Sequence, residues 1–190
     1  MENQNSEKKE KKNKTGKTDR GIETLFRTAL SNHMRLSQIA DSKANILLSV
    51  NAIIISVALS VLLPKVNNPT KAYLAIPTYI LIFTSVVSMI FAIQSTRPKV
   101  IRKHFTIKDI REGKVNLLFF GNFTKIGKND FKEEIKEMMQ NRDYLYESMI
   151  QDWYILGKVL DHKYRLLGIT YHVFMIGLII SVLAFVWPYW

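Results

Sequence analysis

The residues of this 190-residue chain that can do chemistry are basic side chains rather than a catalytic set. Cysteine is absent, which excludes a thiol nucleophile and every cysteine-ligated metal site. The spacing of the four histidines does not suggest a metal site: they are His33, His104, His162 and His172. The sequence has no His-Glu-x-x-His, Walker, Gly-x-Ser-x-Gly or Rossmann motif. We therefore expect no enzymatic activity, no metal and no resident cofactor.

A group of basic and aromatic side chains is the best candidate for binding an anion. Lys163, Tyr164 and Arg165 are consecutive, and Lys43 and Arg97 are expected at the same membrane surface. One interpretation is a belt of basic side chains that anchors the helices at that surface. The other is a site for an anionic ligand, in which Tyr164, or Phe119 and Phe120, stack on a base.

Two charged residues, Arg142 and Asp152, interrupt an otherwise apolar helical seam. They are consistent with a salt bridge, either at the surface or between helices. They are also consistent with a ligand cleft in which Arg142 binds a phosphate. The sequence leaves both interpretations open.

Three uncharged stretches must position these residues: 44–63, 72–96 and 166–190. A helix needs about 20 residues, at about 1.5 Å each, to cross about 30 Å of hydrocarbon. All three stretches are long enough. A soluble protein of this length would have too little remaining chain to cover three such helices, so we predict three transmembrane helices.

The basic residues predict how these helices are oriented. Of the 27 Lys and Arg residues, ten lie in 1–43, two in 64–71 and fifteen in 97–165. Because basic segments stay in the cytoplasm, we expect the N-terminus and 97–165 to be cytoplasmic. The 64–71 loop and the C-terminus would then lie on the outer side of the membrane.

The cytoplasmic parts are expected to be helices that run directly into the membrane. Thr18 or Asp19 can cap the first helix. Asp130 and Glu133 resemble a capping box at the start of a helix that continues into the third span. The segment 116–123 is expected to be a packed loop, a short strand or a membrane-surface segment that covers the cytoplasmic helices.

The predicted fold class is an all-α membrane protein with three transmembrane helices, two of which continue as long cytoplasmic stalk helices. The predicted order is a disordered basic tail (1–18), a cytoplasmic helix (19–43), a first span (44–63), an outer loop (64–71), a second span (72–96), a cytoplasmic helical region (97–165) and a third span (166–190).

Polar and small residues inside the spans favour close helix packing. The polar ones are Asn45, Ser49, Asn51, Ser56, Ser60 and His172. Small residues recur at four-residue spacing at Ala52, Ser56 and Ser60, at Thr84, Ser88 and Ala92, and at Gly177 and Ser181. Hydrogen bonding between helices and a polar line in a pore both explain the polar groups. The small residues fit packing within one subunit or assembly into a homo-oligomer.

Three runs of sequence carry a family resemblance: 40–45, 116–123 and 156–167. Together with the order of the elements over residues 22–186, they resemble the transmembrane effectors of the Pycsar anti-phage systems. The resemblance implies a partner cyclase that makes cyclic UMP or cyclic CMP on phage infection. That nucleotide would activate the effector, which would impair the inner membrane in an abortive infection.

The familiar β-roll that binds cyclic nucleotides is missing, because the sequence offers neither its many short strands nor its glycine-rich phosphate loop. The nucleotide would therefore need a different pocket, and the resemblance does not say where. A constitutive membrane scaffold that anchors a cytoplasmic partner is the alternative function. Neither function involves a nucleic acid polymer.

Overall fold

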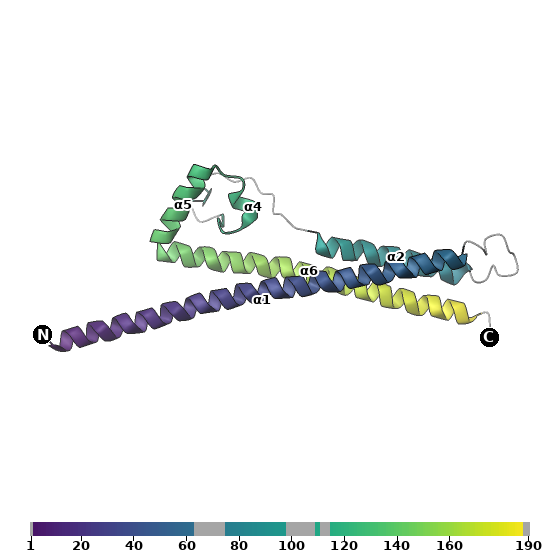
Figure 1. The fold of residues 1–190 in the computed structure, drawn as a ribbon, viewed down its shortest axis with the longest axis horizontal. Coiled ribbons are helices and arrows are strands. Elements are labelled where there is room, and N and C mark those ends of the chain that lie inside the picture. The colour runs from purple at the N-terminus through teal and green to yellow at the C-terminus, as the bar shows by residue number, and fades with distance from the viewer. Residues whose placement is uncertain (1, 63–74, 98–108, 111–114, 188–190) are drawn as a thin grey trace. The chain divides into compact units, whose positions relative to one another are not determined.

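The computed structural model describes residues 2–62, 75–97, 109–110 and 115–187, and all regular secondary structure in these residues is helical. The helices are α1 (Glu2–Leu62), α2 (Ala75–Thr96), α4 (Phe120–Phe123), α5 (Lys128–Gln140) and α6 (Arg142–Val186) (Figure 1). Three of them, α1, α2 and α6, are long and apolar enough to cross a membrane. The predicted all-α membrane fold is therefore confirmed.

Two of the three spans belong to helices much longer than a bilayer requires. Helix α1 has 61 residues and α6 has 45, whereas about 20 residues cross the hydrocarbon. Each continues without interruption beyond its apolar part, as the sequence predicts for the stalk helices. Helix α2, with 22 residues, is close to the length of a single span.

The N-terminal start of α1 differs from the prediction. We expected a disordered tail over 1–18 and a helix cap at Thr18 or Asp19, but α1 begins at Glu2. No proline interrupts the segment.

The predicted stalk helix from Asp130 into the third span is wrong in its first part. Helix α5 ends at Gln140 and α6 begins at Arg142, so the chain breaks at Asn141, where φ is −107° and ψ is 104°. The side chain of Asn141 explains the break, because its Oδ1 accepts a hydrogen bond of 3.1 Å from the Tyr144 N–H and caps α6.

The start of α5 also differs from the prediction. The residue that precedes α5 is Gly127, and no side chain caps the helix there. Asp130 lies inside the first turn, so the capping box expected from Asp130 and Glu133 does not form. The acidic side chain instead lies where it favours the positive end of the helix dipole.

Some predicted elements lie outside the described residues. These are the 64–71 loop and the first residues of the second span. Between residues 98 and 114 of the predicted cytoplasmic helical region, only Asp109 and Ile110 are described, and both are helical.

The chain divides into two compact units. The first contains residues 1–35 and 100–157, and the second contains residues 36–99 and 158–190. The first unit has a core of Ile110, Leu117 and Met138, on which α5 packs. Leu117 comes from the apolar 116–123 segment, which is therefore the packed loop among the three predicted alternatives, with α4 at its end.

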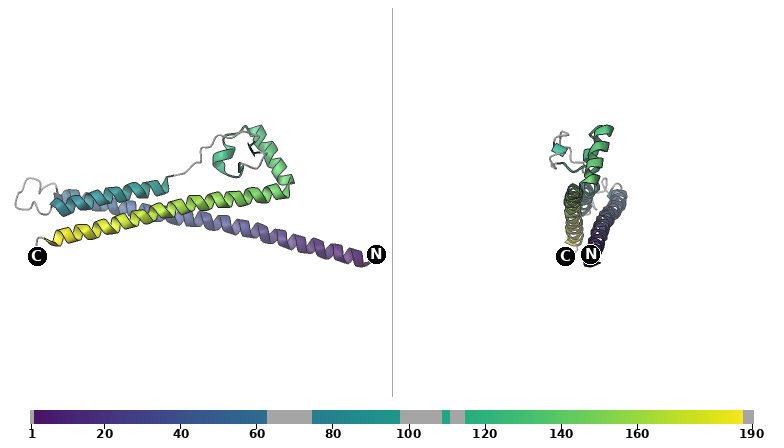
Figure 2. Two further views of the ribbon diagram at one scale, coloured as in Figure 1. Left: turned by 180° about the vertical axis from the view of Figure 1, so that it is seen from behind. Right: turned by 90° about the vertical axis from the view of Figure 1, so that its left-hand side faces the viewer.

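The second unit is a three-helix bundle of the second half of α1, α2 and the second half of α6 (Figures 1 and 2). Its core consists largely of small side chains: Ala40, Ala44 and Ala92, together with Leu47 and Leu167. Alanines permit close approach of helix backbones. Large apolar side chains instead cover the outside of the bundle, as a lipid environment requires.

Candidate functional site

The side chain of Lys163 joins α6 to α1 at the basic end of the spans. Its Nζ donates to both carboxylate oxygens of Asp41 and to Ser37 Oγ, each at 2.9 Å. The Lys163 side chain is 15% exposed and that of Asp41 is 38% exposed, so the charges are partly removed from water. We refer to Lys163, Asp41 and Ser37 as the Lys163 clamp.

The neighbouring groups extend this contact to all three helices. The Tyr164 hydroxyl donates to the Leu36 carbonyl at 3.2 Å. The Ser95 hydroxyl of α2 donates to the Lys163 carbonyl at 3.0 Å. The clamp therefore lies where α1, α2 and α6 meet at the edge of their apolar segments.

Helical spacing explains why Lys163 faces inward. Lys163, Leu167 and Thr170 lie at i, i+4 and i+7, on one face of α6, and Leu167 and Thr170 are buried. Ala40 and Ala44 on α1 are also completely buried, so no large side chain keeps the helices apart. The basic group can thus reach across to Asp41.

The other predicted basic residues of this region face outward. Lys43, Arg97 and Arg165 are all exposed. Arg165 Nη2 donates to His162 Nδ1 at 3.2 Å. These three exposed cations lie beside the apolar segments of three different helices and give that region a positive charge.

Arg142 belongs to the first unit and forms separate contacts. It is exposed and paired with Asp19 of α1, and its guanidinium lies 5.3 Å from the centre of the Tyr146 ring. The hydrogen bond to Tyr146 and the charge of Asp19 raise the pKa of Arg142. The salt-bridge interpretation therefore holds for Arg142, with Asp19 as its partner.

Asp152 is bound by Asn116, not by Arg142. Asn116 Nδ2 donates to Asp152 Oδ1 at 3.2 Å, and Asn116 Oδ1 accepts from the Leu118 N–H at 2.8 Å. Burial raises the pKa of Asp152, and the hydrogen bond from Asn116 opposes part of that rise. The sequence singled out Asp152 but could not show that its partner comes from the 116–123 loop.

A contact in the first unit among Phe26, His33 and Trp153 was not predicted from the sequence. Trp153 Nε1 donates to His33 Nε2 at 2.7 Å, and the Phe26 and Trp153 rings meet edge to face with centroids 6.1 Å apart. The only sequence signal was the presence of Phe26 and His33 on one apolar stripe of α1. Trp153, more than 100 residues later, completes the contact.

Comparison of the sequence with models of protein families identifies the family of this chain. Residues 24–189 match the model of the Pycsar effector protein domain. The chain belongs to the Pycsar effector family. Searches of curated proteins and of solved structures found no match to it. It is therefore an anti-phage defence effector that resides in a membrane.

Within this effector, the polar residues of the spans divide into two groups. Asn51 is buried and its Nδ2 donates to Ser88 Oγ of α2 at 3.4 Å, which is a hydrogen bond between helices. The others face outward from the single chain: Asn45, Ser49, Ser56, Ser60 and His172. The interhelical interpretation is therefore correct for Asn51.

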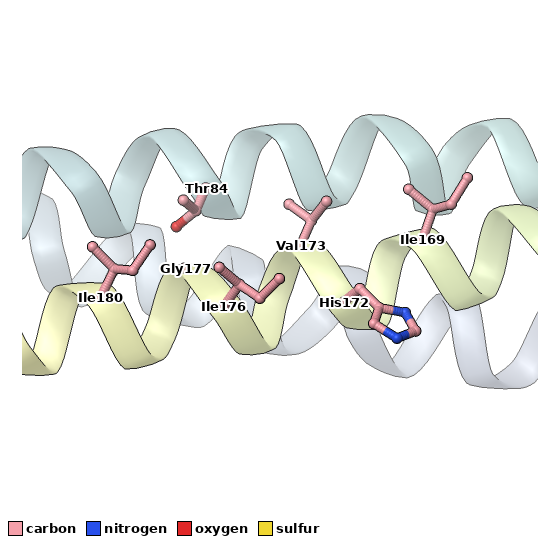
Figure 3. A pocket seen from close by; sticks show the side chains of 7 residues that line it. All are labelled: Thr84, Ile169, His172, Val173, Ile176, Gly177 and Ile180. Carbon is pink, nitrogen blue, oxygen red and sulfur yellow. The ribbon is translucent and has the colours of Figure 1, made fainter.

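The small residues of α2 and α6 pack within one subunit of the effector. A Cβ atom on Gly177 would lie only 2.4 Å from Thr84 Cβ, and Figure 3 shows Thr84 of α2 facing Gly177 of α6. Ile169, Val173 and Ile180 line the groove of about 330 Å³ beside this contact, as does His172. The small residues of α1 at four-residue spacing, Ala52, Ser56 and Ser60, are by contrast exposed.

Proposed function

We propose that this Pycsar effector is activated by a cyclic pyrimidine nucleotide, cyclic UMP or cyclic CMP, made by a partner cyclase. Activation impairs the inner membrane, and the infected cell dies before phage are released. In this proposal the protein is a non-enzymatic effector and binds no nucleic acid polymer. The observation that carries the proposal is the continuity of α1 and α6, each of which runs from the first unit into an apolar span.

The proposed topology follows the basic residues. The N-terminus and residues 97–165 are cytoplasmic, and the C-terminus lies outside. The cyclic nucleotide is made in the cytoplasm, so it meets the first unit and the basic ends of the spans. A change there reaches the bilayer through helices that have no break between the two units.

The proposed nucleotide site uses the basic ends of the spans. Lys43, Arg97 and Arg165 attract the phosphate, and Tyr164 stacks on the pyrimidine. The phosphate also competes with Asp41 for Lys163. A ligand shifts a conformational equilibrium only as far as its affinities for the two states differ. In one state Lys163 is paired with Asp41, and in the other it is free to bind the phosphate. The nucleotide therefore binds the second state more tightly.

Arg142 is a second candidate ligand for the phosphate. It lies in the first unit, whereas the basic ends of the spans belong to the second unit. Its present partners are Asp19 and Tyr146. A nucleotide phosphate would have to displace Asp19. Replacing Arg142 alone therefore distinguishes a site in the first unit from one at the basic ends of the spans.

We also propose that the effector works as a homo-oligomer. The outward face of α1 carries small and polar side chains at helical spacing: Asn45, Ser49, Ala52, Ser56 and Ser60. This face lies opposite the buried Leu47, Asn51 and Ala58, at about 100° per residue. Polar groups exposed to hydrocarbon are costly, and a second copy would cover this face and remove it from lipid.

The test is membrane potential in cells that contain the effector, with cyclic UMP, cyclic CMP or cyclic AMP supplied in turn. Rapid depolarisation by one pyrimidine nucleotide alone is expected. The triple variant Lys43→Ala, Arg97→Ala and Arg165→Ala should lose the response. Arg27→Ala, which removes an exposed arginine paired only with the nearby Glu23, is the matched control.

Two outcomes would count against the proposal. No depolarisation by any nucleotide, with the protein present in the membrane, would favour the constitutive scaffold. A full response in the triple variant would move the site away from the basic ends of the spans, and Arg142→Ala would then be the next variant.

A further inference from the structure

The interior of the membrane bundle contains buried polar side chains beside its apolar core. The buried residues of α2 are Pro77, Ser85, Ser88, Ala92 and Ser95. The large residues of the same helix, such as Phe83, Ile90 and Ile93, are exposed. Asn51 of α1 and Thr170 and Ser181 of α6 are also buried. We refer to the buried serines of α2 with Asn51, Thr170 and Ser181 as the polar seam.

The seam extends over nearly the whole thickness of a bilayer. At one end, Ser95 Oγ donates to the Lys163 carbonyl. At the other end, Ser181 Oγ donates to the Pro77 carbonyl at 2.9 Å. Ser95 and Pro77 are 18 residues apart on α2, which is about 27 Å of helix against about 30 Å of hydrocarbon.

The middle of the seam contains a nearly complete hydrogen-bond network. Asn51 Nδ2 donates to the Leu47 carbonyl at 2.8 Å and to Ser88 Oγ at 3.4 Å. Ser88 Oγ donates to the Thr170 carbonyl at 3.3 Å, and Thr170 Oγ1 donates to the Leu166 carbonyl at 2.9 Å. Each of these N–H and O–H groups has an acceptor.

Two atoms of the network have no hydrogen-bond partner among the described residues: Asn51 Oδ1 and Ser85 Oγ. Asn51 is 0% exposed and Ser85 is 1% exposed. Ser85 precedes Ser88 by three residues and therefore lies on the same face of α2, one turn from the atom that Asn51 contacts. Buried polar atoms at membrane depth need a partner, because hydrocarbon offers none.

We propose that Asn51 and Ser85 bind a water molecule inside the bundle. The water donates a hydrogen bond to Asn51 Oδ1 and accepts one from the Ser85 hydroxyl, which satisfies both atoms. Asn51 Oδ1 and Ser85 Oγ are both uncharged, and among the described residues no group of three His, Asp or Glu could hold a metal ion. A neutral ligand therefore fits the site better than a cation.

This internal water site also has a role in activation, and that part rests on the proposed function. Separating three helices that meet at a hydrated polar seam opens a path lined by hydroxyl and amide groups. Separating three helices with an apolar interior would not. The seam is thus the route by which the activated effector lets ions cross the membrane.

The absence of cysteine in this chain makes a direct test of the water site possible. Ser85→Cys places a single thiol at the site, and deuterium labelling of its S–H group is followed by infrared spectroscopy in membranes transferred to D2O without nucleotide. Since a thiol exchanges its proton readily only when it contacts water, Ser85→Cys should be labelled about tenfold faster than Val86→Cys, the adjacent exposed position on the lipid side. Ala92→Cys, buried on the same face of α2 in the apolar core, is the matched interior control.

The labelling rates decide the proposal. Equal rates for Ser85→Cys and Val86→Cys would overturn it, because the interior would then be dry. Equal rates for Ser85→Cys and Ala92→Cys would also overturn it, because labelling would then report a loose bundle instead of a local water site. Membrane fractionation of each variant confirms that the labelled protein is inserted.

The role in conduction is tested separately. Asn51→Leu removes the amide from the middle of the seam and should reduce nucleotide-induced depolarisation by about tenfold. Gln94→Leu, an exposed polar position on α2, should respond like the unchanged effector. Full depolarisation in both Asn51→Leu and Ser85→Ala would show that ions do not cross the membrane along the polar seam. If the unchanged effector does not respond to nucleotide, the proposed function fails, and the labelling experiment still decides the water site.

Discussion

The ammonium nitrogen of Lys163 lies 2.9 Å from each carboxylate oxygen of Asp41, although the two residues are 122 positions apart in the chain. The pair joins α1 to α6 just before the uncharged segment of each helix. Its partial burial makes it stronger than an exposed ion pair. The contact fixes α1 against α6 beside their apolar segments.

Breaking this pair should loosen the bundle. Asp41→Asn leaves a largely buried ammonium without its counter-ion, so we expect a loss of about 1–3 kcal/mol in the free energy of unfolding. Asp41→Asn with Lys163→Met should cost less than the sum of the single changes. Thermal unfolding in detergent, followed by circular dichroism, measures this cycle. Strict additivity would show that the pair contributes nothing, and Lys43→Met is the control for an exposed lysine nearby.

Gly177 is the glycine of α6 that packing requires. A Cβ atom there would lie 2.4–2.6 Å from three atoms of Thr84, so Gly177→Ala should destabilise the bundle by about 1–3 kcal/mol. A Cβ atom on Gly168 would have no contact within 4 Å. Gly168→Ala should therefore be neutral or stabilising, because alanine favours a helix. The melting temperatures of the two variants provide the comparison.

A compensating change tests the cause of the Gly177 effect. Thr84→Gly removes the side chain that an alanine at position 177 would contact. The double variant should therefore recover part of the stability that Gly177→Ala loses. If it does not, the loss arises from something other than the contact between α2 and α6.

The stability of the first unit should depend on pH through Asp152. Burial raises the pKa of this carboxyl above its ordinary value of 3.8, so the folded state holds the proton more tightly than the unfolded state. The contribution of Asp152 to stability is full below pH 3.8 and declines as the pH rises through the raised pKa. Asp152→Asn should remove this dependence, since an amide oxygen still accepts from Asn116. Unfolding measured from about pH 3.5 to pH 7 checks the slope, and equal slopes in the two proteins would contradict the assignment.

The outward face of α1 should lie at a subunit interface. In this cysteine-free chain, Ser49→Cys should form crosslinked dimers with a short bifunctional thiol reagent in membranes. Val57→Cys, which is also exposed but lies about 100° around the helix from that face, should crosslink much less. Gel electrophoresis after crosslinking measures the difference. Equal crosslinking at both positions would indicate random collision, with no defined interface.

The sequence by itself determined the class of the protein. Three uncharged stretches of at least 20 residues allow only helices that cross a membrane, because a lipid environment leaves no other way to satisfy the backbone. The extension of α1 and α6 beyond their spans was also predictable, since few residues in those segments break a helix. The joint order of these elements was enough to indicate the Pycsar family, which the match over residues 24–189 confirms.

Only the tertiary structure decided which side chains meet. Lys163 and Asp41 are adjacent because two helices pack together. The local sequence of one helix does not predict which residue of the other helix it contacts. The same holds for Trp153 with His33, and for Asn51 with Ser88. The break at Asn141 was missed because apolar periodicity continued across it, while the backbone responded to one asparagine cap. Sequence periodicity shows which face of a helix is apolar, but the pairing of faces depends on close contacts between residues far apart in the chain.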